Sequence, residues 1–345
     1  MANSLKKPIA LDLFCGSGAV TLGLRQAGFD VIGAVDCDPG ACRTYRENHP
    51  KVRLIEDDIR NVDPSIFKDL INDKLDLLVV CAPCQPFSSQ NKHKSEFDKR
   101  RNLVQESQKF IENLNPSLVF LENVPGLVSS EIFDNYKKWL EKKGYTVLKP
   151  MRVDAAELGV PQRRVRAILI ASRDNKIVHS IKIKTQKRLS VGDAIRNLPV
   201  PPIGSENTLK DALHFARKHS ALNIERLKYI PKDGGGRESL PDELQLSCHK
   251  KTKKSSFSDT YGRMRWNDVA PTLTTGCTDI TKGRYAHPDQ NRAITLREAA
   301  RLQSFPDDYR FHGNASQIAM QIGNAVPPAM MKTLATELKK ALNNY

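Results

Sequence analysis

Two cysteines, Cys81 and Cys84, stand three residues apart in the segment DLLVVCAPCQPFSSQNK at residues 76–92. Such a pair can be half of a zinc site, a redox dithiol, or one nucleophile beside an unrelated thiol. A structural zinc site needs four ligands, and the chain contains no second C-x-x-C pair to supply them. A redox dithiol usually opens a helix, whereas here Pro86 and a loop follow the second cysteine. The sequence therefore disfavours both paired interpretations.

A strand boundary between the two cysteines favours different roles for them. Cys81 ends the apolar run LDLLVVCA, a predicted buried strand, where a thiol usually fills a small space in the core. Cys84 follows in a loop that Pro83 and Pro86 stiffen through their fixed torsions. Taken alone, Cys84 is either a reactive nucleophile or an inert loop cysteine.

Polar residues mark the ends of two further predicted strands. Glu122 and Asn123 end the strand SLVFLENV, where a carboxyl can hold or deliver a proton, or can form only a helix cap or a structural ion pair. Arg164 and Arg166 lie on one side of the predicted strand RVRAILIASR. Arginines at a strand end bind a carbonyl oxygen or a phosphate, or else lie on a solvated edge.

A glycine turn follows the first predicted strand in LDLFCGSGAVTLGL. Asp12 stands near the strand end and Gly16 and Gly18 in the turn, but Thr21 occupies the third small position of a dinucleotide fingerprint. The Gly-Lys-Ser/Thr signature of a P-loop is absent. Asp12 would repel a pyrophosphate, whereas it suits a cofactor with an ammonium, a carboxylate and a sulfonium, which describes S-adenosylmethionine.

Acids also end the next two predicted strands. Asp36 ends the second strand, where a carboxylate can accept hydrogen bonds from ribose hydroxyls. Asp58 ends the third strand, close to where an adenine would lie. A lone glycine turn also serves as a plain strand-to-helix connection, but acids at three successive strand ends favour an adenosine-type cofactor.

Strands and helices alternate through the first half of the chain, which predicts an α/β fold with a doubly wound, mostly parallel sheet. The periodicity weakens after about residue 180 and returns at ITLREAARLQSF, where Thr295 and Glu298 form a capping box. The segment QIGNAVPPAMMKTLATELKKAL is interpreted as a loop followed by a helix. We expect a catalytic and cofactor-binding domain at residues 1–185, completed by 315–345, and a smaller domain at 186–314.

The composition bounds the class of protein. The 345 residues are 39% hydrophobic and 27% charged, with no apolar run long enough to span a bilayer and no signal peptide expected. Seven scattered cysteines suit reduced thiols in a cytoplasm. The net charge is +15, and residues 176–260 hold 17 Lys and Arg against nine Asp and Glu. This excess indicates a nucleic-acid partner, although a basic soluble surface is the alternative.

The ordered set of motifs resembles the C5-cytosine methyltransferase family, over about residues 8–335. The motifs are Asp12-x-Phe14-x-Gly16-x-Gly18, Pro83-Cys84-Gln85-Pro86-Phe87-Ser88, Glu122-Asn123-Val124, Gln162-x-Arg164-x-Arg166 and Gln321-x-Gly323-Asn324-Ala325-Val326-Pro327. RAITLREAARLQSFPDDY also resembles a segment of that family. Only about residues 190–260 lack a strong match, where the family carries its variable target recognition region.

The resemblance implies a role for each motif. Cys84 would add to C6 of a flipped cytosine, and Glu122 would engage N3 and the exocyclic amine. Arg164 or Arg166 would bind O2, while Asn123 and Gln85 would support the loop. The pocket for S-adenosylmethionine would be formed by Asp12, Phe14, Gly16, Gly18, Asp36, Asp58, Pro83 and Asn324. No metal site is implied. One departure is Asp36-Cys37, because the family usually has Glu followed by a bulky residue there.

The implied substrate is a specific double-stranded DNA sequence, read by the domain at 186–314. Lys250, Lys251, Lys253 and Lys254 would contact phosphates or lie on a solvated surface, and the Gly234–Gly236 loop would approach a groove or serve as a linker. We expect a cytoplasmic monomer that modifies DNA beside a separate restriction endonuclease. The alternatives are the tRNA-directed branch, whose Cys-Phe-Thr tripeptide is absent here, and a catalytically silent DNA-binding protein.

Overall fold

The computed structural model describes residues 7–83, 102–204, 211–250 and 259–344. Its chain divides into two compact units. Unit 1 comprises residues 1–158, 165–186 and 326–345, and unit 2 comprises residues 159–164 and 187–325. None of the helices in the described residues has the length and apolar character needed to cross a membrane.

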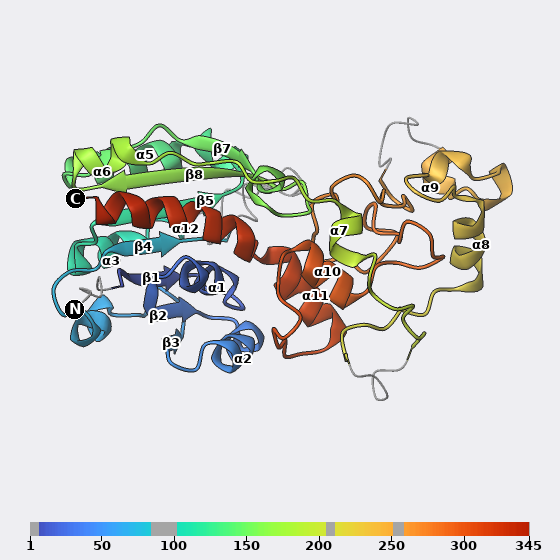
Figure 1. Cartoon of the computed structure of the whole chain (residues 1–345), viewed down its shortest axis with the longest axis horizontal. Coiled ribbons are helices and arrows are strands. Elements are labelled where there is room, and N and C mark those ends of the chain that lie inside the picture. Colours follow the sequence, from blue (N-terminus) through green and yellow to red (C-terminus); the bar gives the residue numbers. More distant parts are fainter. Residues whose placement is uncertain (1–6, 84–101, 205–210, 251–258, 345) are drawn as a thin grey trace, which may run out of the picture. The chain divides into compact units, whose positions relative to one another are not determined.

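Unit 1 is built on one eight-stranded sheet (Figure 1). The strand order is β3-β2-β1-β4-β5-β8-β6, and β7 pairs with β8 outside this path. Strands β1 to β5 pair in parallel, whereas β8 runs antiparallel to β5, β6 and β7. The strands are β1 (Ile9–Leu13), β2 (Asp30–Asp36), β3 (Arg53–Glu56), β4 (Leu77–Val80), β5 (Leu118–Asn123), β6 (Thr146–Val147), β7 (Met151–Asp154) and β8 (Val165–Ser172).

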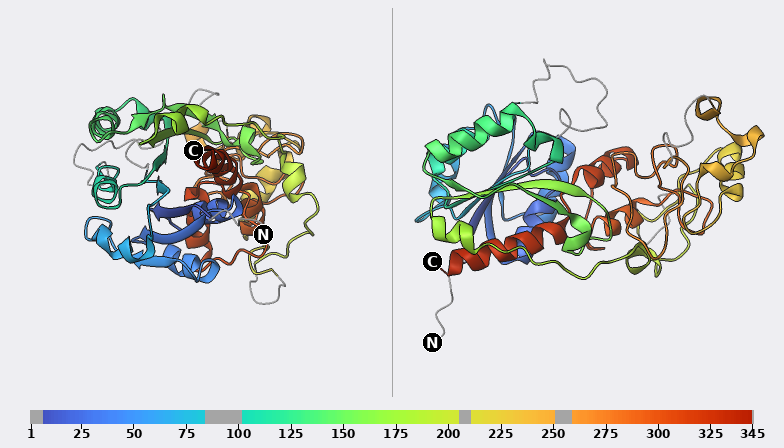
Figure 2. Two further views of the ribbon diagram at one scale, coloured as in Figure 1. Left: turned by 60° about the vertical axis from the view of Figure 1, so that its left-hand side comes forward. Right: turned by 90° about the horizontal axis from the view of Figure 1, so that it is seen from above.

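Helices cover both faces of the sheet, so the predicted doubly wound α/β class is confirmed (Figure 2). Their bounds are α1 (Ala19–Gln26), α2 (Pro39–Asn48), η1 (Pro64–Leu70), α3 (Ser107–Leu114), α4 (Pro125–Val128), α5 (Glu131–Lys142), η3 (Ala155–Leu158), α6 (Asn175–Ser180) and α12 (Pro328–Asn343). Side chains of η1, α3 and α5 form a core with one face of β1, β4, β5 and β8. Helices α1, α6 and α12 lie on the other face.

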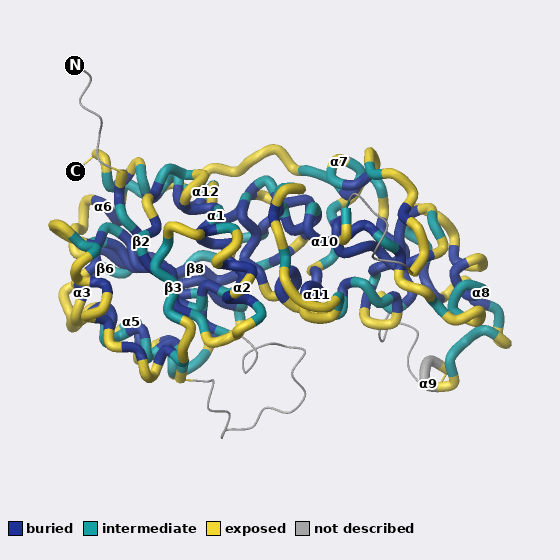
Figure 3. Tube along the Cα trace, turned by 90° about the horizontal axis from the view of Figure 1, so that it is seen from below, coloured by how far each residue is buried: buried dark blue, intermediate teal, exposed yellow. Residues whose placement is uncertain are grey.

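Helix α12 packs closely on α1 because a glycine faces it. A Cβ at Gly23 would lie 2.7 Å from both Met331 Cβ and the Pro328 carbonyl oxygen. The close approach brings the C-terminal helix of the chain onto the helix that follows the first strand. Residues far apart in sequence thus stabilise the start of the sheet (Figure 3, where β2 and β8 are drawn largely as buried).

Unit 2 consists of short helices joined by long irregular segments. The helices are α7 (Val191–Ile195), α8 (Ala221–Tyr229), η4 (Arg237–Ser239), η5 (Asp242–Leu244), α9 (Ser247–Lys250), α10 (Leu296–Leu302) and α11 (Ala315–Asn324). Arg263, only 1% exposed, compensates for the sparse secondary structure by donating to the backbone carbonyls of Leu227, Ile230, His287 and Gln290. A buried arginine of this kind satisfies many loop carbonyls at once.

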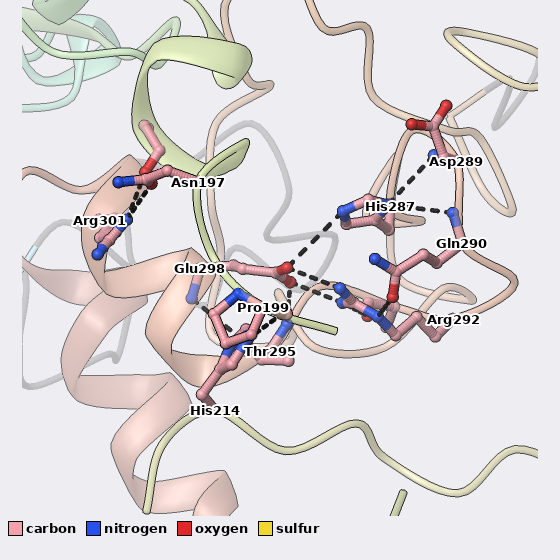
Figure 4. A network of polar contacts seen from close by, with 12 residues as sticks. Asn197, Pro199, His214, His287, Asp289, Gln290, Arg292, Thr295, Glu298 and Arg301 are labelled. Atoms are coloured by element: carbon pink, nitrogen blue, oxygen red, sulfur yellow. Dashed lines mark hydrogen bonds and ion pairs between the residues drawn. The ribbon is translucent and has the colours of Figure 1, made fainter. Parts of the chain in front are cut away.

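A second buried polar network surrounds the first turn of α10 (Figure 4). The predicted capping box is confirmed, since Thr295 and Glu298 each bond the other's backbone N–H. Both Glu298 oxygens also accept from Arg292 at 2.7 Å, and His287 Nε2 lies 3.8 Å from Glu298 Oε1. Burial lowers the pKa of His287 to about 4, so this histidine is neutral at neutral pH.

Two expectations about the C-terminal third differ from the structure. Residues 321–324 were expected in a loop but form the end of α11, because Asn314 and Gln317 make a capping box that starts this helix. Helix α11 also belongs to unit 2, whereas the predicted catalytic domain included residues from 315 onward. The chain re-enters unit 1 only at Val326.

Candidate active site

The carboxyl ends of β1, β4 and β5 lie at the same edge of the sheet because these strands are parallel neighbours. Strand β1 has β2 on one side and β4 on the other, so the loops after β1 and β4 leave the sheet in opposite directions. In open α/β sheets, ligands bind at such a switch point. Strand β8 is antiparallel, so its first residues reach this same edge beside the end of β5.

Glu122 and Arg166 form a buried ion pair at this edge. Arg166 Nε lies 2.9 Å from Glu122 Oε1, and the two side chains are 11% and 7% exposed. Arg166 also donates to the carbonyl of Val165 at 2.8 Å. The pair therefore places a carboxyl beside a cation in a site almost closed to solvent, where electrostatic interactions are strong.

Asn123 ties the end of β5 to the end of β4. Its Nδ2 donates to the Ala82 carbonyl at 3.0 Å, and its Oδ1 accepts from the Val124 amide at 2.9 Å.

Ala82 precedes the expected nucleophile by two residues. Cys84 and Gln85 themselves lie outside the described residues, as do Lys251, Lys253 and Lys254. The described contact therefore holds the backbone at Ala82.

Cys81 immediately follows β4 and is partly buried. Burial, with a further contribution from Glu122, raises the pKa of the Cys81 thiol well above its ordinary value. A thiol in this state is protonated at neutral pH and is a poor nucleophile. No group of three potential metal-binding side chains occurs within the described part of the chain.

Arg164 and Arg166 do not share a strand face as expected, because β8 begins at Val165. Arg164 belongs to unit 2 and is 4% exposed. Its guanidinium donates to the carbonyls of Leu273 at 3.3 Å and Gly323 at 3.1 Å, with Asn324 at 3.5 Å. Arg164 thus holds backbone within unit 2, whereas Arg166 faces Glu122.

Two buried glutamines reinforce this part of unit 2. Gln162 Nε2 donates to Gln303 Oε1 at 2.8 Å, and Gln162 Oε1 accepts from the Leu273 amide at 2.9 Å. Gln303 Nε2 in turn donates to the Ile322 carbonyl. The network joins the segment before β8 to the end of α11, so exposed Asn324 stands on a rigid base.

The turn after β1 holds three residues in the left-handed region. Phe14, Gly16 and Gly18 have φ angles of 61°, 52° and 91°. Glycine adopts this region freely, but a bulky residue such as Phe14 does so at a cost and marks a constrained site. A Cβ added at Gly16 would meet no atom within 4 Å, so open space adjoins the turn.

Asp12 lies in β1 with its side chain fully buried. Its Oδ2 accepts from Thr21 Oγ1 at 2.8 Å, while its buried Oδ1 accepts no hydrogen bond from the described residues. Burial raises the pKa of Asp12 to about 7. Thr21, the residue that departs from a dinucleotide fingerprint, therefore links α1 to β1.

Asp36 ends β2, as expected, and braces the turn. Its Oδ2 accepts from the Gly16 amide at 2.8 Å and its Oδ1 from the Asp38 amide at 2.9 Å. Burial raises the pKa of Asp36. Cys37 beside it is exposed, and burial of part of its surface, with Asp36 and Asp58, raises the pKa of its thiol.

Asp58 lies two residues beyond the end of β3 rather than within it. It forms an ion pair with Arg60, whose hydrogen bond lowers the pKa of Asp58 to about 2. Asp12, Asp36 and Asp58 place carboxyl groups at or just beyond the ends of three neighbouring strands, where they suit amino, ammonium and hydroxyl donors. They would repel a phosphate, so the residues fit S-adenosylmethionine better than a dinucleotide.

Four residues that hold neighbouring segments in place were not predicted from the sequence: Tyr45, His49, Ala82 and Gln303. Tyr45 and His49 stand four apart at the end of a predicted helix, and this spacing alone signals a shared face. Their partners, Thr21 in α1 and Gly18 at its N-cap, are more than 20 residues away, and no local pattern identifies them.

Comparisons with known proteins agree on one family. A profile of the C-5 cytosine-specific DNA methylase family matches residues 10–340. The chain is 37% identical over 343 residues to the Type II methylase M.HgiDII of Herpetosiphon aurantiacus, covering 96% of this chain and 95% of that protein. It is 35% identical to the Type II methyltransferase M.PspPI of a Psychrobacter species, covering 96% and 79%.

A solved structure agrees in fold and sequence. It is described as a DNA modification methyltransferase encoded within a prophage of E. coli, and it matches with a TM-score of 0.75 and 26% identity over 98% of this chain and 100% of that one. Since the profile spans nearly the whole chain and both relatives exceed 30% identity, the chain belongs to the C-5 cytosine-specific DNA methylase family and is a DNA cytosine-5 methyltransferase.

Proposed function

We propose that the protein transfers a methyl group from S-adenosylmethionine to C5 of a flipped cytosine in a specific double-stranded DNA sequence, through a covalent bond between Cys84 and C6. It would act as the modification enzyme of a restriction-modification system, as a monomer in a bacterial cytoplasm. The observation that carries the proposal is the buried Glu122–Arg166 pair. The next residue, Asn123, binds the carbonyl of Ala82, which precedes Cys84 by two residues.

The proposed chemistry divides one difficult step into easier ones. Addition of Cys84 Sγ to C6 moves the electron pair of the C5–C6 double bond onto C5. Glu122 promotes this addition by holding a proton at N3 of the base, and Arg166 binds the O2 atom. When bound, S-adenosylmethionine supplies an electrophilic methyl group. A base then takes the C5 proton, the electron pair of that C–H bond restores the C5–C6 double bond, and Sγ leaves C6 as a thiolate, which frees the enzyme.

The target cytosine must leave the base stack, because a protein thiol cannot reach C6 within a duplex. Unit 2 carries much of the basic excess and would bind the DNA and read its sequence, with exposed Lys250 among its phosphate contacts. Phosphate contacts strengthen binding without reading bases. Pro83 and Asn324 would also contact the cofactor.

The description of the matching family as a DNA methylase supports DNA over tRNA as substrate, and both relatives carry Type II in their names. Their names also support a restriction endonuclease that acts separately on the same sequence. The presence of both Cys84 and Glu122 argues against a catalytically silent protein, because these residues carry the proposed chemistry.

Bisulfite sequencing of a plasmid propagated with the protein tests the proposal. We expect one cytosine to be protected in every copy of a short sequence, and no protection with Cys84→Ser. Cys81→Ser is the matched control and should retain protection. A plasmid without protected cytosines, combined with methylation of co-purified tRNA, would transfer the activity to the tRNA-directed branch.

A further inference from the structure

Helix α2 contacts one face of α1 through a row of polar side chains outside the proposed chemistry. Tyr45 and His49 are four residues apart, so they lie on one side of α2, where His49 is the C-cap. Both are buried, with exposures of 0% and 2%. Their partners Gly18, Thr21 and Arg25 are spaced at intervals of three and four, which places them on one side of α1.

The hydrogen-bond partners of His49 determine the tautomer and charge of its imidazole. Its Nδ1 lies 3.3 Å from Arg25 Nη1, and because a guanidinium can only donate, Nδ1 must accept. Its Nε2 lies 3.0 Å from the Gly18 carbonyl oxygen, which can only accept, so Nε2 carries the proton. Burial lowers the pKa of His49 to about 4, which keeps the ring neutral at neutral pH.

Tyr45 makes the second contact in the row. Thr21 Oγ1 donates its hydrogen to Asp12 Oδ2, so the Tyr45 hydroxyl donates to Thr21 Oγ1 over 2.8 Å. The Tyr45 and His49 rings pack with centroids 4.9 Å apart. The tyrosine thus supports the imidazole and also holds the middle of α1.

The Gly16–Gly18 turn, which leads into α1, is held by contacts from two neighbouring elements. Asp36 binds the Gly16 amide from the end of β2, and His49 binds the Gly18 carbonyl from the end of α2. Between these anchors the backbone has positive φ angles at Gly16 and Gly18. A turn in this conformation depends on its neighbours to stay in one geometry.

We propose that His49 is a positioning residue for S-adenosylmethionine, because it joins Gly18 and Arg25 at the two ends of α1 and thereby fixes the Gly16–Gly18 turn. The proposal rests on the proposed function, which assigns that turn to the cofactor. His49 has no contact with the reacting atoms in this scheme. Its loss therefore weakens cofactor binding and leaves the rate at saturating cofactor nearly unchanged.

Calorimetric binding of S-adenosylmethionine to the full chain tests this with three variants. His49→Gln keeps an amide N–H that can reach the Gly18 carbonyl, whereas His49→Asn is too short and keeps only an acceptor for Arg25. His49→Phe keeps the ring without hydrogen bonds. We expect His49→Phe and His49→Asn to raise the Kd for S-adenosylmethionine about 10-fold, which corresponds to the loss of one buried hydrogen bond. The Kd of His49→Gln should stay within about threefold of the wild-type value. KM for the cofactor should follow Kd, with kcat changed less than about twofold.

Equal Kd values for wild type and His49→Phe, or a Gln variant as weak as Phe, would overturn the positioning role while the proposed function stands. Wild-type protein that binds no S-adenosylmethionine would overturn the proposed function itself. Nitrogen-15 NMR of the wild-type imidazole needs no variant to fold. It should show the proton on Nε2, and a proton on Nδ1 would refute the geometry.

Discussion

Arg166 Nε lies 2.9 Å from Glu122 Oε1, and neither side chain is more than 11% exposed. The pair joins the last residues of the parallel strand β5 to the first residues of the antiparallel β8. Removing one partner of a buried pair leaves the other uncompensated, at a cost of about 3–5 kcal/mol. This relationship therefore serves both the stability of the sheet edge and the proposed chemistry.

Glu122→Gln should lower the single-turnover rate of methyl transfer by about 100-fold or more, because an amide cannot hold the proton at N3 of the cytosine. DNA and cofactor affinities should change little. The measurement is tritium transfer to a duplex that contains the target sequence. A variant within about threefold of wild type would remove Glu122 from the chemistry.

Arg164 and Arg166 should respond differently to replacement by lysine. Arg164→Lys should cost about 1–3 kcal/mol of stability, because one ammonium cannot reach the carbonyls of both Leu273 and Gly323 as the guanidinium does. Arg166→Lys should chiefly lower kcat. Urea unfolding and steady-state methylation separate the two effects. A strongly reduced kcat in Arg164→Lys with unchanged stability would contradict the division of roles.

Asn123→Asp should lower kcat by at least about 10-fold, because a carboxylate oxygen would face the Ala82 carbonyl in place of the Nδ2 donor. The bond from the Val124 amide would remain. The affinity for S-adenosylmethionine should stay within about twofold, since the change is transmitted toward Cys84. Equal losses in kcat and cofactor affinity would indicate a general disturbance of the sheet edge.

Local sequence patterns predicted the strand ends well, and with them Glu122, Asn123 and Asp36. A buried parallel strand is a continuous apolar run, so its end is visible where the first polar residue appears. The same rule misplaced Asp58, because β3 ends at Glu56 and the chain continues for two residues before the acid. The Thr295–Glu298 capping box was equally readable, since both partners lie within one turn.

Long-range polar contacts were not predictable in this way. Alternation along a strand put Arg164 and Arg166 on one face, but the strand begins between them and Arg164 turns to carbonyls more than 100 residues away. Likewise, the sequence indicates only that His49 lies at the end of a helix. Its contact with Gly18, 31 residues away, is evident only in the folded chain. Such contacts depend on how elements pack, which periodicity does not encode.

Asp12 should make the stability of the cofactor-free protein fall between pH 5 and pH 8. Burial raises the pKa of Asp12 to about 7 in the folded chain, against 3.8 for an ordinary carboxyl. The folded state therefore binds this proton more tightly than the unfolded state, and the associated stability is complete below about pH 4 and lost as the pH rises through 7. Asp12→Asn, which keeps an acceptor for Thr21, should remove this part of the pH dependence.

Urea unfolding of wild type and Asp12→Asn at pH 5 and pH 8 measures the effect. The free energy of unfolding should fall between these pH values by on the order of a few kcal/mol more in wild type than in the variant. Asp58→Asn is the matched control, because its ion pair with Arg60 lowers the pKa of Asp58 to about 2 and its contribution is constant over this range. A wild type and an Asp12→Asn variant that lose equal stability would show that Asp12 is ionised throughout. The buried Oδ1 would then have a partner that the described residues do not supply.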